Sequence, residues 1–401
     1  MAEAGARTVV LATARTPIGR AHKGSLTDVH PDDLLVAVAR AVLDANPELD
    51  PADLDEVLLG CSLAAGEQGG NLARVLAVQL GLDGVPGSTV NRYCASSMQT
   101  TRMADQAVRT GDGELFLSLG LESVSRVRQP GPDPLAEERP AAFSGLRPSV
   151  PWQDPRERGE LPNVFLGMGE TAENVADLTG VTRQQMDEFA VRSQELAAQA
   201  TASGFWKTEL IPITTPEGTV VDTDDSPRPG TTMEALAALE PVFRDNGRVT
   251  AGNSCPLNDG AAALLLASER AAERLGAAPL ARVLSTSTFA LSPEVMGLGT
   301  VGAGRRALAA AGLDANDLDL VEINEAFAAQ VIPTYEQLGV PLEKVNVHGG
   351  AIALGHPFGM SGARITGTLL NGLRTRGGRY GLQTMCVAGG QGMAMVVENL
   401  T

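Results

Sequence analysis

The sequence predicts an α/β protein built from two similar halves. Short apolar segments that favour strands alternate with segments that have helical spacing, which is the pattern of this fold class. In addition, one twelve-residue segment occurs twice: residues 49–60 read LDPADLDEVLLG and residues 313–324 read LDANDLDLVEIN, with six positions identical. Each copy follows a helical segment and enters a strand, so a duplicated fold explains the match. Convergence on the same turn chemistry is the alternative.

The predicted elements follow one another in the same way in both halves. In the first half, strands are expected at 7–12 and 56–61, with a helix at 32–45 whose apolar residues recur at helical spacing. In the second half, strands are expected at 281–287 and 320–324, with a helix at 304–312.

A stretch of different character interrupts the first half. Prolines are frequent over 129–163, which disfavours long helices and central strands there. Residues 168–204 are then helical in pattern, and 211–250 favour loops and short strands. We therefore expect a loop domain inserted at about 123–246, of the kind that often forms lids or binding loops. The predicted division of the chain is 1–275, including this insertion, followed by 276–401.

Charge and composition restrict the classes of partner. The 401 residues carry a formal net charge of −17 and only 3% are aromatic, which disfavours nucleic acid and anionic membranes as partners. The N-terminus has no pattern of a secretory signal, and the longest apolar stretches, such as 261–267, are too short to cross a bilayer. Four cysteines without close pairing make no disulfide framework, so a cytoplasmic protein is expected.

Cys94 is the first candidate for chemistry. It lies in VNRYCASSMQTTRMADQAVRTG, where an extended stretch is followed by a predicted helix. A helix N-terminus stabilises a thiolate through its dipole and free N–H groups, and the same N–H groups can hold an oxyanion. A buried structural cysteine is the alternative for this motif on its own.

His356 is the second candidate. It lies in NVHGGAIALGHPFGMSGARITGTLL, between Gly355 and Pro357, in a rigid turn before a helix expected to begin near Ser361. A histidine held in this way is suited to act as general base toward a thiol. His348 in the same motif is expected to be a packing residue.

Two further motifs carry polar residues at the ends of strands. Cys386 ends an apolar strand in TMCVAGGQGMAMVVE, and Asn324 follows another in VEINEAFAAQ. None of these segments has the spacing of a metal site, so no metal is expected.

Taken together, these motifs resemble those of the thiolases, and the resemblance extends over the whole chain. It includes RTPIGR near the N-terminus, MGETAEN at 168–174 and AGNSCPLNDGAAA at 251–263. The similarity is greater to the 3-ketoacyl-CoA and acetyl-CoA acyltransferases of bacterial fatty-acid metabolism and β-oxidation than to the sterol-carrier type. The resemblance implies a duplicated five-layer αβαβα fold with an inserted loop domain.

The resemblance also implies roles for the candidate residues. Cys94 would carry the acyl group after activation by His356, and Cys386 would handle the α-proton of the second acyl-CoA. Asn324 would position a water that joins His356 in binding the enolate oxygen. The backbone N–H groups of Cys94 and Ala388 would hold the thioester oxygen.

Departures from the family pattern concern substrate contacts. The resemblance implies acyl-CoA contacts at five positions, namely Met168, Arg228, Cys255, Phe327 and Phe358. Cys255 replaces a serine and Phe358 a smaller aliphatic residue, which leaves the acyl chain length open.

Ala388 stands where glycine is usual, and we predict that it keeps negative φ because Gly389 and Gly390 can take up a left-handed turn.

The predicted function is that of an acetyl-CoA C-acetyltransferase working by ping-pong transfer through S-acyl-Cys94. A 3-ketoacyl-CoA thiolase for longer or branched chains is one alternative, and a non-catalytic acyl-CoA-binding scaffold is another. A condensing synthase of the same fold would lack the second catalytic cysteine, so Cys386 disfavours it. Coenzyme A is expected as substrate and product, with no other cofactor, and the chain is expected to form a homodimer or homotetramer.

Overall fold

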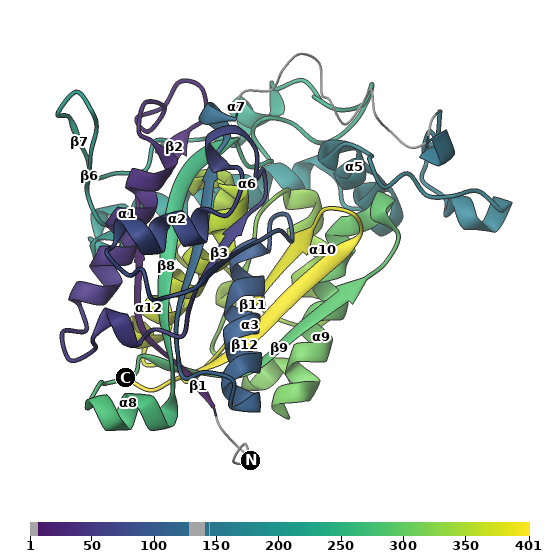
Figure 1. Cartoon of the computed structure of the whole chain (residues 1–401). Helices are drawn as coiled ribbons and strands as arrows, with labels where there is room; N and C mark the ends of the chain where they lie inside the picture. The colour runs from purple at the N-terminus through teal and green to yellow at the C-terminus, as the bar shows by residue number, and fades with distance from the viewer. Residues whose placement is uncertain (1–6, 128–140, 144) are drawn as a thin grey trace.

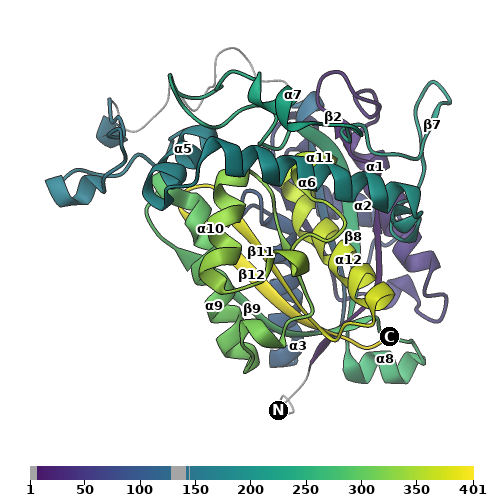
Figure 2. The ribbon, with the colours of Figure 1, turned by 180° about the vertical axis from the view of Figure 1, so that it is seen from behind.

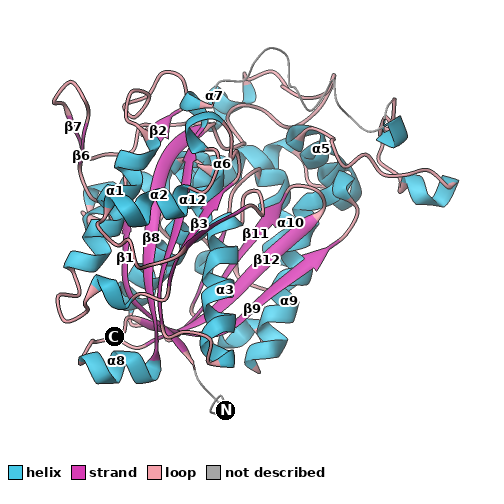
Figure 3. Ribbon diagram, viewed as in Figure 1, coloured by secondary structure: helices cyan, strands magenta, loops and turns pink. Residues whose placement is uncertain are grey.

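A ten-stranded sheet dominates the computed structural model, which describes residues 7–127, 141–143 and 145–401. Nine strands follow one path in the order β10-β11-β12-β9-β1-β8-β5-β3-β4, and β2 (Gly19–Arg20) pairs with β8 off this path. Figure 1 shows the strands crossing the molecule with helices around them, and Figure 3 marks these strands in magenta.

The two halves of the sheet have the same topology. In the N-terminal half, β3 and β5 are parallel, and β8 and β1 then follow antiparallel. In the C-terminal half, β10 and β11 are parallel, and β12 and β9 then follow antiparallel. The strands of the N-terminal half are β1 (Thr8–Arg15), β3 (Glu56–Cys61), β4 (Gly87–Val90), β5 (Leu115–Ser123) and β8 (Asn258–Ser268). Those of the C-terminal half are β9 (Ala281–Ala290), β10 (Leu320–Ile323), β11 (Tyr380–Val387) and β12 (Gln391–Asn399).

The predicted duplication is therefore confirmed. Both copies of the repeated segment form a short 3-10 turn, Pro51–Asp53 and Ala315–Asp317, and then enter the equivalent strands β3 and β10. The halves join where β1 pairs with β9 over two residues.

Helices form three layers around these strands. The helix α1 (Pro31–Asp44) packs on β1, β5 and β8, and α9 (Gly299–Ala311) packs on β9, β11 and β12. Between the halves lie α3 (Ser96–Thr110) and α12 (Phe358–Arg376), which contact each other and strands of the sheet. The remaining helices of the two halves are α2 (Leu72–Gln79), α8 (Glu269–Leu275), α10 (Ala328–Leu338) and α11 (Ala351–Leu354).

The buried apolar side chains divide in the same way, into two outer clusters and a central one. The central cluster combines side chains from both halves, for example Leu264 of β8 and Met385 of β11, with Met98 of α3 and Met360 of α12. The result is the expected five-layer αβαβα arrangement. Close contact in the middle layer depends on Gly362, since a Cβ there would lie 2.5 Å from the backbone nitrogen of Met98. The helix α12 begins at Phe358, three residues before the position expected from the sequence.

The chain leaves the sheet after β5 and returns in β8, which is the neighbouring strand. The intervening residues form α5 (Met168–Thr179), α6 (Arg183–Ala202), β6 (Ile213–Thr214), β7 (Val220–Val221) and α7 (Met233–Ala237). Figure 2 shows α6 running across one end of the molecule, beside α10 and α11, which it contacts. Residues 129–140 and 144 of the proline-rich stretch, including PGPDP, lie outside the described residues, and the part of the stretch that is described forms only short 3-10 turns such as Pro155–Arg158.

The ends of these helices follow from local chemistry. His30 caps α1 by accepting the backbone N–H of Asp32, with Pro31 in the first helical position. Thr182 and Gln185 form a reciprocal capping box at the start of α6.

Candidate active site

Cys94 lies between β4 and α3, in the turn just before the helix, and is partly exposed. The preceding residue, Tyr93, has φ of 46°, a left-handed value that is costly for a side chain of this kind. Asn91 accepts the backbone N–H of Tyr93 at 2.8 Å and thereby supports this turn. The strained turn presents the Cys94 thiol beside its own backbone N–H and that of Ala388, both of which donate to the sulfur.

The predicted stabilisation of a thiolate is wrong for the free protein. Burial raises the pKa of the Cys94 thiol to about 12, and the nearby Glu122 carboxylate acts in the same direction. The two backbone N–H groups lower the pKa but do not compensate for the loss of hydration. Cys94 is therefore a protonated thiol at neutral pH and needs a base.

His356 supplies such a base and is 1% exposed. It lies in the turn before α12, where its backbone N–H donates to Asn258 Oδ1 at 2.9 Å. Burial, together with the nearby Arg364 guanidinium, lowers the pKa of its imidazole to about 3. The ring is therefore neutral at physiological pH, the form in which it can accept a proton.

Asn324 brings an amide to this ring. Its Nδ2 lies 3.1 Å from His356 Nε2, and its backbone N–H donates to Thr384 of β11 at 3.0 Å. Its Oδ1 is buried and has no hydrogen-bond partner among the described residues. One acceptor beside the imidazole is thus left free for a further donor.

Cys386 is the penultimate residue of β11, and Ala388 begins the turn that leads from β11 into β12. Cys386 is 1% exposed, and burial raises the pKa of its thiol well above the usual range, with the neighbouring Cys94 and Cys255 acting in the same direction. Ala388 has no positive φ, whereas Gly389 and Gly390 have φ of 75° and 78°. The prediction for the Ala388 backbone is confirmed, because the two glycines form the left-handed part of the turn.

Cys255 is the third thiol in this region. Burial raises its pKa, and the neighbouring Cys94 and the Glu325 carboxylate contribute. Its backbone N–H donates to Ala326 O at 3.1 Å, which ties the Cys255 segment to the segment that carries Asn324.

Two buried carboxylates, Glu122 and Glu325, bind the segments that carry the site residues to one another. This role was not predicted from the sequence. Glu122 accepts the backbone N–H groups of Ser62, Leu63 and Gly359, so it fixes the start of α12 near His356. Burial raises its pKa to about 7. Glu122 is the penultimate residue of β5, and Glu325 follows β10 by two residues. A place at the end of a strand does not by itself reveal which donors a carboxylate will bind.

Glu325 makes a second such junction, one residue after Asn324. Its carboxylate accepts from Ser193 Oγ at 2.7 Å, Asn346 Nδ2 at 2.8 Å and the backbone N–H of Ile352 at 3.0 Å. A Cβ at Gly350 would lie 2.2 Å from this carboxyl group, so glycine is required there. Glu325 thus joins the inserted helix α6 to the segment that precedes His356.

Comparison with known families agrees with this geometry. The chain matches the N-terminal domain of thiolases over residues 8–270 and the C-terminal domain over residues 277–399. The chain belongs to the thiolase family. It is accordingly a thiolase-type acyltransferase.

Similar thiolases include enzymes named for different acyl-CoA substrates. The chain is 43% identical over 398 residues to the 3-oxoadipyl-CoA/3-oxo-5,6-dehydrosuberyl-CoA thiolase of Escherichia coli strain K12, covering 96% of this chain and 98% of that one. It is also 43% identical over 397 residues to an acetyl-CoA acetyltransferase of Pseudomonas aeruginosa, covering 97% and 98%.

Solved thiolase structures share the fold. The acetyl-CoA acetyltransferase of Bacillus anthracis has a TM-score of 0.87 at 36% identity, covering 98% of this chain and 99% of that one. Human mitochondrial 3-ketoacyl-CoA thiolase has a TM-score of 0.87 at 35% identity, with both chains covered completely. Within the described part of this thiolase, no helix is long and apolar enough to cross a membrane.

The residues predicted to contact acyl-CoA lie around this centre in two groups. Phe358 stands edge-on to the His356 ring at a centroid distance of 5.2 Å, and Phe327 packs edge-on against Phe243 at 6.1 Å. Met168 begins α5 and packs against the outer apolar cluster that contains Phe327 and Cys386.

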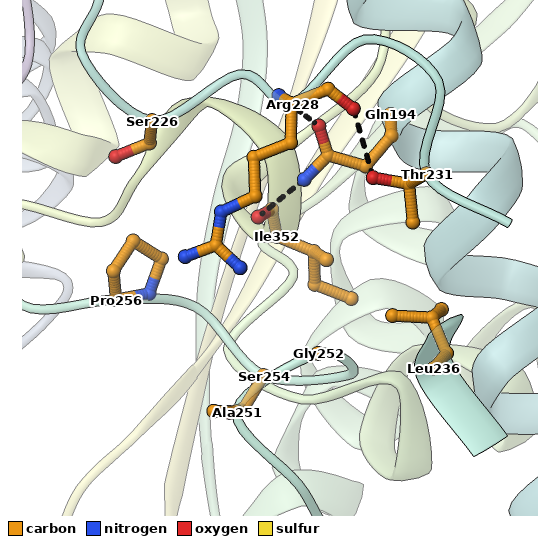
Figure 4. A pocket seen from close by; sticks show the side chains of 10 residues that line it. All are labelled: Gln194, Ser226, Arg228, Thr231, Leu236, Ala251, Gly252, Ser254, Pro256 and Ile352. Atoms are coloured by element: carbon orange, nitrogen blue, oxygen red, sulfur yellow. Dashed lines mark hydrogen bonds between the residues drawn. The ribbon is translucent and has the colours of Figure 1, made fainter. Parts of the chain in front are cut away.

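Arg228 belongs to the second group and lines a pocket with an empty volume of about 350 Å³. Its backbone N–H donates to Gln194 Oε1 at 2.8 Å, while its side chain extends among Ser226, Pro256 and Ile352 (Figure 4). The residues on either side of Cys255, Ser254 and Pro256, also line the pocket, which therefore lies next to Cys255. The chain's acidic charge makes a local arginine of this kind necessary for an anionic ligand.

Proposed function

We propose that this thiolase interconverts a 3-ketoacyl-CoA and coenzyme A with two acyl-CoAs, through an acyl group carried on Cys94. The observation that supports this best is a pair of neighbouring protonated thiols, Cys94 and Cys386, together with a neutral imidazole, His356. His356 lies just before α12, and α12 packs on α3, the helix that follows Cys94. These protonation states are the ones from which cleavage begins.

In the first step of cleavage, the Cys94 thiol gives its proton to His356 Nε2, and the sulfur attacks the C3 ketone. The bond between C2 and C3 then breaks, which leaves the acyl group on Cys94 and the enolate of acetyl-CoA. Protonated His356, and a water held by the free Asn324 Oδ1, stabilise the enolate oxygen. Cys386 gives its proton to C2, so that acetyl-CoA leaves and Cys386 becomes a thiolate.

In the second step, an incoming coenzyme A gives its thiol proton to Cys386 and attacks the acyl-Cys94 thioester. The oxyanion of this tetrahedral intermediate accepts the backbone N–H groups of Cys94 and Ala388, which both point toward the sulfur in the free protein. Cys94 leaves and recovers its proton from His356. Condensation of two acyl-CoAs follows the same steps in reverse, and every proton is returned.

We propose acetoacetyl-CoA and acetyl-CoA as the principal substrates. Phe358 beside His356 narrows the space next to the reacting atoms, which suits a short acyl group. Arg228 has no ion-pair partner among the described residues and would bind a phosphate of coenzyme A at the mouth of the pocket.

The experiment that tests the acyl-enzyme is direct. Wild-type protein is incubated with acetyl-CoA and digested, and the peptides are analysed by mass spectrometry. We expect one acetyl group on Cys94. An acetyl group found only on Cys61, Cys255 or Cys386 would contradict the assignment.

Acyl-CoAs with a distal carboxylate are a second candidate substrate class, because a similar thiolase at 43% identity acts on 3-oxoadipyl-CoA. Its distal carboxylate would need a cation near Cys94. Arg92 lies two residues before Cys94, and its side chain binds only the neutral amides of Gln99 and Gln391 among the described residues. A kcat/KM for 3-oxoadipyl-CoA at least about tenfold above that for acetoacetyl-CoA would favour the dicarboxylate, and Arg92→Gln should then abolish the preference.

We also propose that the chain associates with itself. The strand β4 is the last in the sheet and leaves one edge unpaired among the described residues. Val75, Val78 and Tyr93 near this edge are each more than 40% exposed. A second copy pairing along β4 would cover both the edge and these side chains. Light scattering should give a mass of two or four chains, and a monomer at micromolar concentration would refute the proposal.

A further inference from the structure

We propose that Ser361 is a positioning residue that fixes the tautomer of His356, so that the ring carries its hydrogen on Nδ1 and Nε2 stays unprotonated as the base. This inference deepens the proposed function and rests on it for its kinetic consequence. The tautomer itself is a property of the free protein and can be measured without substrate.

The contacts of Ser361 set the direction of its hydrogen bonds. Its Oγ lies 2.6 Å from His356 Nδ1 and 2.8 Å from the carbonyl oxygen of Pro357. A carbonyl oxygen only accepts, so the single hydroxyl hydrogen of Ser361 goes to Pro357. The Ser361 oxygen can then only accept from the ring, which places a hydrogen on Nδ1.

The other side of the ring agrees with this direction. His356 Nε2 lies 3.1 Å from Asn324 Nδ2, and an amide NH₂ group only donates. Nε2 is therefore an acceptor. The hydrogen bonds run in one direction, from Asn324 through the imidazole and Ser361 to Pro357, and only the tautomer with hydrogen on Nδ1 satisfies all of them.

Burial makes this arrangement difficult to replace. Ser361 and Asn324 are 0% exposed and His356 is 1% exposed, so bulk water cannot take over the role of the hydroxyl group. Without it, the Nδ1 hydrogen would be a buried donor with no acceptor, which is unfavourable. The ring would then favour a hydrogen on Nε2, where it blocks proton transfer from Cys94.

The position of Ser361 follows from the local fold. Pro357 caps α12, and Ser361 lies four residues later, so its backbone N–H and its hydroxyl group both reach the Pro357 carbonyl. The same helix turn that anchors the serine therefore holds it against the histidine on the N-terminal side of Pro357.

A hydroxyl group that binds the carbonyl four residues earlier also has a purely structural role in helices, and α12 contains a matched example. Thr366 donates to Gly362 O at 2.8 Å and to Gln383 Oε1 at 2.7 Å, and it is 1% exposed. None of its hydrogen bonds involves His356. The variant Thr366→Val therefore removes a buried hydroxyl group from the same helix without changing the imidazole.

The first measurement is the tautomer of His356, from two-bond ¹H–¹⁵N correlations of ring-labelled histidine at pH 7. Only four histidines are present, and His356→Asn identifies the signal. We expect a protonated Nδ1 and an unprotonated Nε2 in wild type and Thr366→Val. Wild-type protein with its hydrogen on Nε2 would overturn the proposal, and this result does not depend on whether any variant folds.

The second measurement is the rate of Cys94 acetylation by acetyl-CoA under single-turnover conditions. We expect Ser361→Ala to be slower than Thr366→Val by about 10²-fold, the scale of a general-base contribution, and Ser361→Thr to recover most of the rate. Equal rates for Ser361→Ala and Thr366→Val would overturn the proposal. If wild-type protein forms no acetyl-Cys94 at all, the proposed function fails, while the ring signal still decides the role of Ser361.

Discussion

His356 Nε2 lies 3.1 Å from Asn324 Nδ2 in the interior of the protein. This contact joins the segment that follows β10 to the turn that precedes α12. The imidazole is thus held as a neutral group between an amide and a serine hydroxyl group. The cost of charging a group in this environment has consequences for stability as well as for catalysis.

Replacing His356 should change how stability depends on pH. The pKa of its imidazole is about 3 in the folded protein and has its ordinary value of 6.5 in the unfolded chain. Between these values the unfolded state binds the extra proton, so stability is present above pH 6.5 and is lost as the pH falls. We expect the free energy of unfolding of wild type to decrease by about 1 kcal/mol more per pH unit than that of His356→Asn between pH 6 and 5.

Urea titrations of both proteins at several pH values measure this difference. His348 also has a lowered pKa, of about 4, but it is present in both proteins and cancels. Parallel pH profiles for wild type and His356→Asn would show that the imidazole is not held neutral.

The reactivity of Cys94 should increase steeply with pH. Because burial raises the pKa of this thiol to about 12, the thiolate is a small fraction at pH 7 and increases about tenfold per pH unit. We expect the rate of alkylation by iodoacetamide at Cys94 to increase without a plateau from pH 7 to pH 9. A plateau below pH 8 would indicate a preformed thiolate.

Removing either catalytic thiol should produce a different loss. Cys94→Ala should abolish acyl exchange between coenzyme A molecules and all carbon–carbon bond chemistry. Cys386→Ala should still accept acetyl on Cys94, but cleavage of acetoacetyl-CoA should fall by about 10²–10⁴-fold because C2 has no proton donor. Isotope exchange into coenzyme A and a thiolysis assay separate the two reactions. Near wild-type cleavage by Cys386→Ala would remove this residue from the mechanism.

Strand ends and glycine-rich turns explain why much of the site could be predicted. Cys94, Asn324 and His356 lie in turns next to strands or helices, and Cys386 lies near the end of β11. These patterns are local, so the sequence indicates the surroundings of each residue and the family resemblance supplies their order. The protonation of Cys94 could not be predicted, since it depends on burial and on Glu122 from another strand. The hydrogen-bond partners of Glu122 and Glu325 could not be predicted either, because they come from segments far apart in the chain.

Two buried carboxylates on this part of the chain should tolerate substitution differently. Glu322 of β10 has a pKa raised to about 8 by burial, so it is mostly protonated at pH 7, and Glu322→Gln should change stability by less than about 0.5 kcal/mol. Glu325 accepts three donors, and Glu325→Gln would place an NH₂ group against one of them. We expect it to cost about 1–3 kcal/mol in the free energy of unfolding. Equal stability of the two variants in urea would contradict the proposed junction.

The turn from Ala388 to Gly390 provides a graded test of how the oxyanion site is built. Ala388 has no positive φ, so Ala388→Gly relieves no backbone strain and only increases the conformational entropy of the unfolded chain. We expect it to lower the free energy of unfolding by about 0.5–1 kcal/mol and to leave activity within about twofold. Gly389 has φ of 75° with no atom closer than 3.8 Å to an added Cβ, so Gly389→Ala should cost about 1–2 kcal/mol of conformational strain. Gly390 combines φ of 78° with a Cβ position 2.4 Å from the Leu291 carbonyl oxygen. Because backbone must move to relieve that overlap, Gly390→Ala should cost about 3–5 kcal/mol, the sum of strain and overpacking, and should displace the Ala388 N–H from Cys94. Urea unfolding and Cys94 acetylation rates measured on all three variants should rank them in this order, and a large activity gain in Ala388→Gly would show instead that the alanine methyl group obstructs the oxyanion site.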